Sequence, residues 1–190
     1  MKKFIFLITL LLLPSLIFAS DFSRFLRNAA QQSQATNNSN SGFNWVWSSS
    51  NQSNQPQNMI NAAISGTANV YICHANYNNL GVHPGTLTKN GCLISYAGSA
   101  YVENNFQVLT GFRSITWRNA NVLNQFLQNP ASFQNTAPII GGNEQGHNLY
   151  VCRTYMNNRI HVGKIVGNNC NIGWHGQELL QSNYQVLFVN

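Results

Sequence analysis

The sequence predicts an all-β protein in which two tandem repeats form antiparallel sheets related by a pseudo-twofold axis. Residues 70–109 and 149–187 share a pattern of aromatic, cysteine, histidine and glycine positions, which indicates a duplicated unit. Each copy contains short runs rich in β-branched and aromatic residues, separated by Asn-Gly or Gly-Asn dipeptides that favour turns. We place repeat one at residues 45–111 and repeat two at residues 112–190, so that the β domain covers residues 45–190.

The chain begins with a segment typical of a secretory signal peptide. Lys2 and Lys3 precede a mostly apolar stretch, and Ala19 offers a small residue for cleavage. We therefore expect residues 1–19 to be removed. The mature protein is then secreted, to the periplasm or beyond the cell, and has no membrane-spanning segment because no later stretch is long and apolar enough.

Residues 20–44 are predicted to form a polar N-terminal arm that links the signal peptide to the β domain. Part of the arm is compatible with a short amphipathic helix, because four apolar residues have helical spacing, namely Phe22, Phe25, Leu26 and Ala29. The rest of the arm is rich in Asn, Gln and Ser and has little to bury. A second polar stretch, residues 48–58, is predicted to be a long loop.

Within each repeat, the expected strands follow one another in the same order. VYIC and LYVC are the first strands, and HPG (83–85) and HVG (161–163) are placed at turns. TLT or KIV follows, then CLISY or CNIGW, and finally NFQVL or NYQVL. Trp47 and Trp117 are matched as the tryptophans that precede each unit.

Four cysteines in a secreted chain indicate two disulfides. The spacing within each repeat is nearly the same, which favours Cys73–Cys92 and Cys152–Cys170; pairing between the repeats is the alternative. A zinc site is not expected, because the C-x2-C spacing is missing and the compartment is oxidising. We expect no metal and no cofactor.

Charge is scarce, at 7% of residues, and the net charge of +6 reflects 10 basic against 4 acidic residues. The basic residues are scattered and form no patch, so nucleic-acid binding is not expected. Two of the four acids, Glu144 and Glu178, lie in repeat two together with Lys164. In repeat one, the lysine is replaced by Thr86 and the second acid by Ala100. This asymmetry predicts one binding site in repeat two and a structural copy in repeat one.

A carboxylate and an ammonium together suit a sugar, since vicinal hydroxyls both donate and accept hydrogen bonds. Tyr155 and Trp174 are candidates for an aromatic face that covers the C–H side of the sugar, and Arg153 is a candidate for positioning Glu144. The alternatives are a surface ion pair between Lys164 and Glu178 and core positions for the aromatic residues. His83 and His161 are expected to brace the turns.

Several of these features resemble the DM-nine repeat family of lectin-like proteins. The matching motifs in repeat two are Tyr150–Arg153, His161–Lys164, Trp174–Glu178 and Tyr184–Leu187, with weaker copies in repeat one. The resemblance implies a β-rich lectin that binds mannose-type sugars, often as a homodimer. It also implies that two residues bind the sugar: an acid in the loop after a Gly-Gly pair, here Gly141–Gly142, and the lysine of the His-x-Gly-Lys motif. These roles fall on Glu144 and Lys164. The family usually has Asp at the first position.

Two other classes of function remain as alternatives. Glu144 and Glu178 are the candidate acid and base of a glycan hydrolase, if their spacing suits that reaction. We expect no enzyme, because the sequence has no Gly-x-Ser-x-Gly, His-Glu-x-x-His or phosphate-loop motif. The second alternative is a surface adhesion protein that binds protein partners through its polar arm.

Overall fold

The computed structural model describes residues 42–51 and 55–190. The predicted signal peptide, residues 1–19, and the candidate helix around Phe22–Ala29 lie outside these described residues. The elements, in chain order, are β1 (Phe43–Ser49), β2 (Ile72–Asn76), β3 (Gly81–Thr88), β4 (Gly91–Tyr96), β5 (Ser99–Glu103), β6 (Asn105–Gly111), β7 (Ile115–Asn119), α2 (Ala120–Gln128), the 3-10 helix η1 (Pro130–Ser132), β8 (Ala137–Pro138), β9 (Ile140–Glu144), β10 (His147–Met156), β11 (Arg159–Val166), β12 (Asn169–Trp174), β13 (Gln177–Gln181) and β14 (Gln185–Val189).

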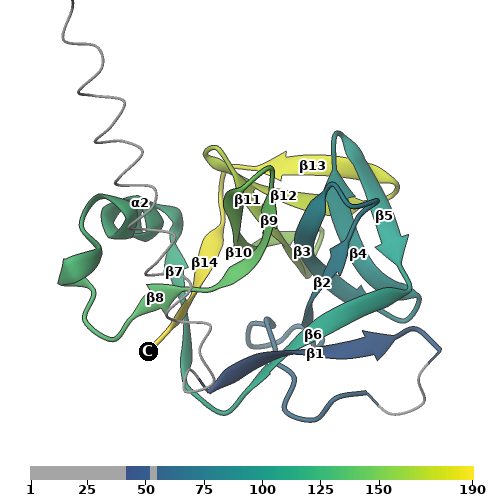
Figure 1. Ribbon diagram of the computed structural model, residues 1–190, viewed down its shortest axis with the longest axis horizontal. Helices are drawn as coiled ribbons and strands as arrows, with labels where there is room; N and C mark the ends of the chain where they lie inside the picture. The colour runs from purple at the N-terminus through teal and green to yellow at the C-terminus, as the bar shows by residue number, and fades with distance from the viewer. Residues whose placement is uncertain (1–41, 52–54) are drawn as a thin grey trace, which may run out of the picture. The chain divides into compact units, whose positions relative to one another are not determined.

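The strand order shows the duplication directly. The described residues form an antiparallel sheet with the order β1-β6-β2-β3-β4-β5-β13-β12-β11-β10-β14-β7, in which the second half repeats the first in reverse. Figure 1 shows the junction, where β13 (yellow) reaches β5 (teal). Two equivalent backbone hydrogen bonds of 3.0 Å join them, from Ala100 N to Gly176 O and from Glu178 N to Gly98 O. The prediction of an all-β, antiparallel, pseudo-twofold fold is confirmed.

The turns lie elsewhere than the sequence predicted. The sequence predicts turns at HPG (83–85) and HVG (161–163), but both segments lie inside strands, β3 and β11. The hairpins reverse at Asn78–Asn79 and Asn157–Asn158, where all four residues have positive φ angles between 47° and 59°. Asparagine tolerates this left-handed conformation better than most residues. The Asn-Asn pairs therefore form the hairpin turns, and the histidines belong to the sheet.

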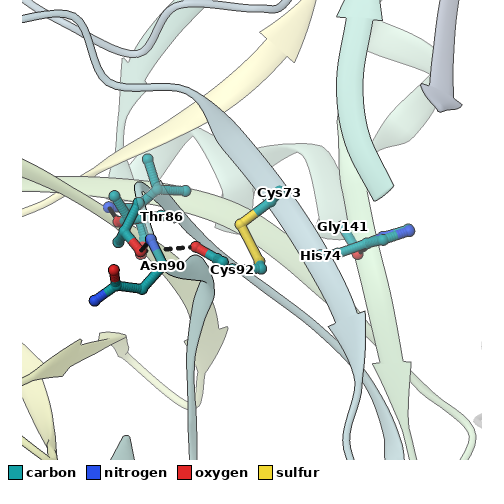
Figure 2. Close-up of a disulfide and its surroundings, with 9 residues drawn as sticks. Cys73, His74, Thr86, Asn90, Cys92 and Gly141 are labelled. Carbon is teal, nitrogen blue, oxygen red and sulfur yellow. Dashed lines mark hydrogen bonds between the residues drawn. A yellow bond between two sulfur atoms is a disulfide. The ribbon is translucent and has the colours of Figure 1, made fainter. Parts of the chain in front are cut away.

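Each repeat is cross-linked by its own disulfide, as the spacing favoured. Cys73 and Cys92 are bonded, with Cα atoms 5.8 Å apart, and Cys152 and Cys170 are bonded, with Cα atoms 5.9 Å apart. Figure 2 shows the first of these bonds joining β2 to β4, with His74 and Gly141 beside it. All four sulfurs are used, so the alternative pairing between the repeats is wrong. In each repeat the disulfide joins two strands that flank a third: β2 and β4 on either side of β3, and β10 and β12 on either side of β11.

The core consists of one apolar cluster shared between the repeats and one cluster inside each repeat. The shared cluster includes Ile72, Leu109, Val151, Val162 and Leu187, all of which are almost completely buried. The clusters of repeat one and repeat two contain the two disulfides. Because apolar burial is the main favourable contribution to folding, the shared cluster joins the two repeats into one folded unit.

Repeat two also contains a short helix that the sequence analysis did not predict. Helix α2 buries Leu123, and its Phe126 ring packs edge-on against Phe188 of β14, with centroids 6.3 Å apart. The apolar residues Val122, Leu123, Phe126 and Leu127 have the i, i+4 spacing that predicts such a helix. No helix within the described residues is both long and apolar enough to span a membrane.

Candidate functional site

Lys164 is a lysine whose side chain is only 3% exposed. It lies on β11 between two neighbouring strands, opposite Val151 of β10 and Asn171 of β12. A buried ammonium is unfavourable unless charged and polar groups compensate for its lost hydration. The structure supplies these groups from both repeats, and we call Lys164, Glu144, Glu178 and His83 the Lys164 cluster.

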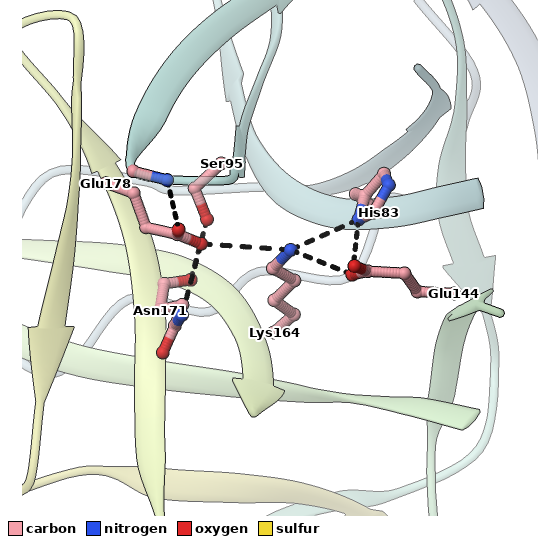
Figure 3. Close-up of polar contacts among 7 residues, drawn as sticks. His83, Ser95, Glu144, Lys164, Asn171 and Glu178 are labelled. Carbon is pink, nitrogen blue, oxygen red and sulfur yellow. Dashed lines mark hydrogen bonds and ion pairs between the residues drawn. The ribbon is translucent and has the colours of Figure 1, made fainter. Parts of the chain in front are cut away.

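The three charged residues of the predicted site lie together. Lys164 Nζ is 3.2 Å from Glu144 Oε2 and 3.7 Å from Glu178 Oε1 (Figure 3). The two acids differ in exposure, because the Glu144 side chain is 25% exposed and that of Glu178 is 8% exposed. The surface ion pair considered for Lys164 and Glu178 is therefore wrong, since both partners are buried. Glu144 is the member of the cluster that meets solvent.

Glu178 links the two repeats through its carboxylate. Its Oε2 accepts a hydrogen bond of 2.8 Å from the N–H of Gly98 in repeat one, and its Oε1 accepts one of 3.1 Å from the amide of Asn171. Burial raises the pKa of Glu178, but the Gly98 N–H, Asn171, Lys164 and a hydrogen bond with Ser95 together lower the pKa below its usual value. Glu178 is therefore ionised at neutral pH.

His83 of repeat one is the member of the cluster that the sequence analysis missed. Its Nδ1 lies 3.3 Å from Lys164 Nζ, and its side chain is fully buried. Burial, followed by the nearby Lys164 charge, lowers the pKa of His83 to about 4, so the ring is neutral at pH 7. Because an ammonium only donates, Nδ1 is the acceptor and the proton resides on Nε2. The Nε2 atom is buried without a hydrogen-bond partner.

Repeat one also supplies the aromatic ring that contacts Lys164. Lys164 Nζ lies 5.3 Å from the centre of the Tyr96 ring, within the range of a cation–π contact. Tyr96 also meets His83 edge-on, with ring centroids 5.2 Å apart. The charges of the cluster thus come from repeat two, whereas His83 and Tyr96 come from repeat one. The site lies at the junction of the repeats and is not confined to the second one.

At the equivalent place on the other side of the pseudo-twofold axis, Thr86 and Ala100 occupy the positions of Lys164 and Glu178. His161 packs edge-on against Trp174 with centroids 4.8 Å apart, which repeats the His83–Tyr96 contact. Thr86 stands where Lys164 stands, and its hydroxyl accepts from Val162 N at 2.9 Å and bonds Val162 O at 3.2 Å. Thr86 therefore joins β3 to β11. The replacement of lysine by threonine exchanges an ion cluster for a backbone contact.

Arg153, a predicted site residue, lies in a different part of the molecule from Glu144. Its guanidinium donates to Gln185 Oε1 at 2.8 and 3.0 Å and to Ala62 O at 2.7 Å, and it stacks 4.5 Å from the Trp117 ring centre. Burial lowers the pKa of Arg153 to about 10, which leaves it charged at neutral pH. Arg153 therefore links repeat two to Ala62 and Ala63, which precede β2 in repeat one.

A matching arrangement in repeat one corrects the repeat alignment. His74 stacks on Trp45 with centroids 3.8 Å apart, and its ring nitrogens lie 2.6 Å from Gly141 O and from Gln107 Oε1. Trp45 pairs with Leu109 as Trp117 pairs with Leu187, so Trp45 is the counterpart of Trp117. The assignment of Trp47 to that role is wrong, and Trp47 is 69% exposed. His74 thus takes the place of Arg153.

The other two aromatic candidates also lie apart from the Lys164 cluster. Tyr155 is 54% exposed, and its hydroxyl bonds Asn158 in the turn between β10 and β11. Trp174 lies between His161 and His175 on the far side of the pseudo-twofold axis. Tyr96, the counterpart of Trp174, is the ring that contacts Lys164.

The cluster can offer a ligand a carboxylate at the surface and an ammonium directly beneath it. Within residues 42–51 and 55–190, no group of three or more His, Cys, Asp or Glu side chains is arranged to hold a metal ion. The cluster presents hydrogen-bonding capacity, with Glu144 as acceptor and Lys164 as donor 3.2 Å apart.

The fold and the site together define a duplicated, disulfide-linked β protein with an ion cluster at the junction of its two repeats. The chain belongs to the DM9 repeat family, whose pattern matches residues 64–166 and 143–190. The resemblance noted from the sequence is therefore confirmed.

Two further comparisons concern curated proteins and solved structures. No curated protein compared with the chain matches it. The structure of the nematode sperm cell motility protein MFP2B is similar, with a TM-score of 0.51 and 13% sequence identity over 78% of this chain and 45% of that chain. At this identity the likeness shows the fold alone. The chain spans less than half of the length of the MFP2B chain.

Proposed function

We propose that this protein is a secreted carbohydrate-binding protein that takes mannose-type glycans at the Lys164 cluster and does not cleave them. The observation on which the proposal rests is the pair formed by Glu144 and Lys164, a partly exposed carboxylate above a buried ammonium. The resemblance to lectin-like DM-nine proteins assigns the same two residues to sugar binding. Two disulfides agree with an oxidising compartment.

A sugar hydroxyl suits this pair because it donates and accepts at once. When the Glu144 side chain moves outward, one hydroxyl enters between the two groups, donates to the carboxylate and accepts from the ammonium. A neighbouring hydroxyl donates to the second carboxylate oxygen. Each such bond to a charged group contributes roughly 1.5–3 kcal/mol. Glu178 and His83 remain in place and hold the ammonium where the sugar meets it.

The expected affinity for one sugar is low, since the ligand must displace an existing ion pair. A dissociation constant in the millimolar range corresponds to about 4 kcal/mol of binding free energy. Useful binding then comes from multivalency, through a branched glycan or a homodimer that presents two sites. We include the homodimer in the proposal on this ground.

The test is a titration of the folded protein with methyl α-mannoside, alongside a glycan array. Glu144→Gln removes the exposed charge without changing the shape of the side chain, and we expect it to abolish detectable binding. Lys89→Gln is the matched control, because Lys89 is an exposed charged residue in the turn between β3 and β4. If Glu144→Gln binds as tightly as the wild type, the site lies elsewhere; if the wild type binds no glycan, the adhesion alternative gains support.

Glu178 is poorly suited to be the acid of the hydrolase alternative. A glycosidase needs one protonated carboxylic acid to assist the leaving group, whereas the pKa of Glu178 is lowered and its oxygens already accept from Gly98 and Asn171. We therefore expect no release of reducing sugar from mannose oligosaccharides during prolonged incubation. Release that disappears in Glu178→Gln would instead establish an enzyme.

A further inference from the structure

Three tyrosines of repeat one form a continuous aromatic group beside the Lys164 cluster. Tyr96, which contacts Lys164 Nζ, lies 5.3 Å from Tyr77 between ring centroids, and Tyr77 lies 4.2 Å from Tyr101. All three side chains are half-buried, so each keeps part of its surface in solvent. We call these three residues the tyrosine group.

The backbone places the tyrosine group next to Glu144. Tyr77 N donates to Gly81 O at 3.0 Å, and Gly81 pairs with Glu144 across β3 and β9. Gly81 has a φ angle of 150°, and a β-carbon there would lie 2.4 Å from Asn143 O. Only glycine allows this close approach of the two strands. The backbones of Tyr77 and Glu144 are therefore both paired with that of Gly81.

Tyr77 and Tyr101 pack against the apolar cluster of repeat one, and the residues at the same positions of repeat two pack in the same way without being tyrosines. Strand register makes Met156 the counterpart of Tyr77, Trp174 that of Tyr96, and Leu179 that of Tyr101. None of these counterparts has a phenol hydroxyl. The tyrosine group therefore occurs only beside the ion cluster, and the corresponding place beside the uncharged Thr86 lacks it.

We propose that the tyrosine group is a second sugar subsite, so that the protein binds oligosaccharides more tightly than single sugars. This inference rests on the proposed function, because the first sugar residue is the one held by Glu144 and Lys164. The next residue of the glycan places its C–H face on the Tyr77 ring and its hydroxyls near the phenol groups. A hydrogen bond with Tyr101 raises the pKa of Tyr77, and the two rings lie 4.2 Å apart between centroids.

The experiment compares the affinity for methyl α-mannoside with that for a linear mannobiose, by titration calorimetry or NMR on the full chain. We expect the wild type to bind the disaccharide about five- to tenfold more tightly than the monosaccharide, which exceeds the roughly twofold statistical advantage of two residues. Tyr77→Ala and Tyr101→Ala should each keep the monosaccharide affinity and lose most of this gain. Tyr77→Phe, which keeps the ring, should retain the larger part of it.

Tyr155→Ala is the matched control, since Tyr155 is an exposed tyrosine outside the tyrosine group. Unchanged monosaccharide affinity also reports that each variant is folded. A wild type that binds the monosaccharide but gains no more than twofold from the second residue overturns the subsite and leaves the proposed function standing. The same holds if Tyr77→Ala keeps the gain. If the wild type binds neither sugar, both proposals fall.

Discussion

Replacement of Lys164 by methionine tests whether the ion cluster is held together by charge. Methionine keeps most of the length and the apolar stem of lysine but removes the ammonium. The carboxylate of Glu178, whose side chain is 8% exposed, then loses its only cation in the Lys164 cluster and retains its hydrogen bonds with Gly98, Asn171 and Ser95. Removing one partner of a buried ion pair costs about 3–5 kcal/mol. We expect the lower end, because Glu144 can turn to solvent.

Urea denaturation with the disulfides intact is the assay. For a slope of about 1–3 kcal/mol per molar urea, a loss of about 3 kcal/mol lowers the midpoint by roughly 1–3 M. Lys89→Met is the matched control, and as an exposed substitution it should change the unfolding free energy by about 0.5 kcal/mol or less.

A double-variant cycle separates charge from packing. In Lys164→Met/Glu178→Gln, the buried carboxylate is gone, so the second substitution should restore part of the stability that the first one removed. The loss caused by Lys164→Met should also shrink at a pH where Glu178 is protonated. A loss equal to that of Lys89→Met, or one that is the same at every pH, would refute the reasoning.

Three further predictions concern stability. Acid should lower the free energy of unfolding in two pH ranges. The first runs from pH 6.5 to about 4, where the unfolded chain binds a proton at His83 before the folded chain does. The second lies below pH 4.5, where the unfolded chain binds a proton at Glu178 before the folded chain does. His83→Gln should reduce the loss in the first range without abolishing it, because burial also lowers the pKa values of His74 and His161; a plot of unfolding free energy against pH measures the change. Arg153→Met should cost about 3 kcal/mol or more in urea denaturation, because it leaves buried oxygens unpaired. Gly163→Ala should destabilise more than Gly146→Ala. A β-carbon at residue 163 would lie 2.0 Å from Asn171 O, whereas one at residue 146 would meet nothing within 4 Å and would cost only the strain of its φ angle of 81°.

Features that depend on neighbouring residues could be predicted without the fold. The strands follow from β-branched and aromatic runs, and the disulfides from the nearly equal spacing of the cysteines in the two repeats. Even here local chemistry was ambiguous, because both the histidine-glycine segments and the Asn-Asn pairs suit turns. The Asn-Asn pairs form them, since they adopt positive φ angles while His83 and His161 are placed in the buried interior of the strands.

The residues that complete the candidate site could not be found in this way. Comparison of the two copies indicated that Glu144, Lys164 and Glu178 belong together, but it assigned the whole site to repeat two. His83 and Tyr96 enter it from repeat one, at sequence separations that no local pattern encodes. Arg153 is a reasonable candidate by its charge. Its hydrogen bonds to Ala62 of repeat one and Gln185 of repeat two instead give it a structural role in joining the repeats.

The amino-acid sequence by itself therefore determined the class of the fold, the duplication, the covalent links and the unequal distribution of charge between the copies. Each of these depends on residue type and spacing along the chain. Only the tertiary structure decided what surrounds Lys164, because β5 and β13 pair across the pseudo-twofold axis and bring the two repeats face to face. A buried ammonium takes its partners from whatever lies within a few ångströms, and that neighbourhood exists only after the repeats have packed together.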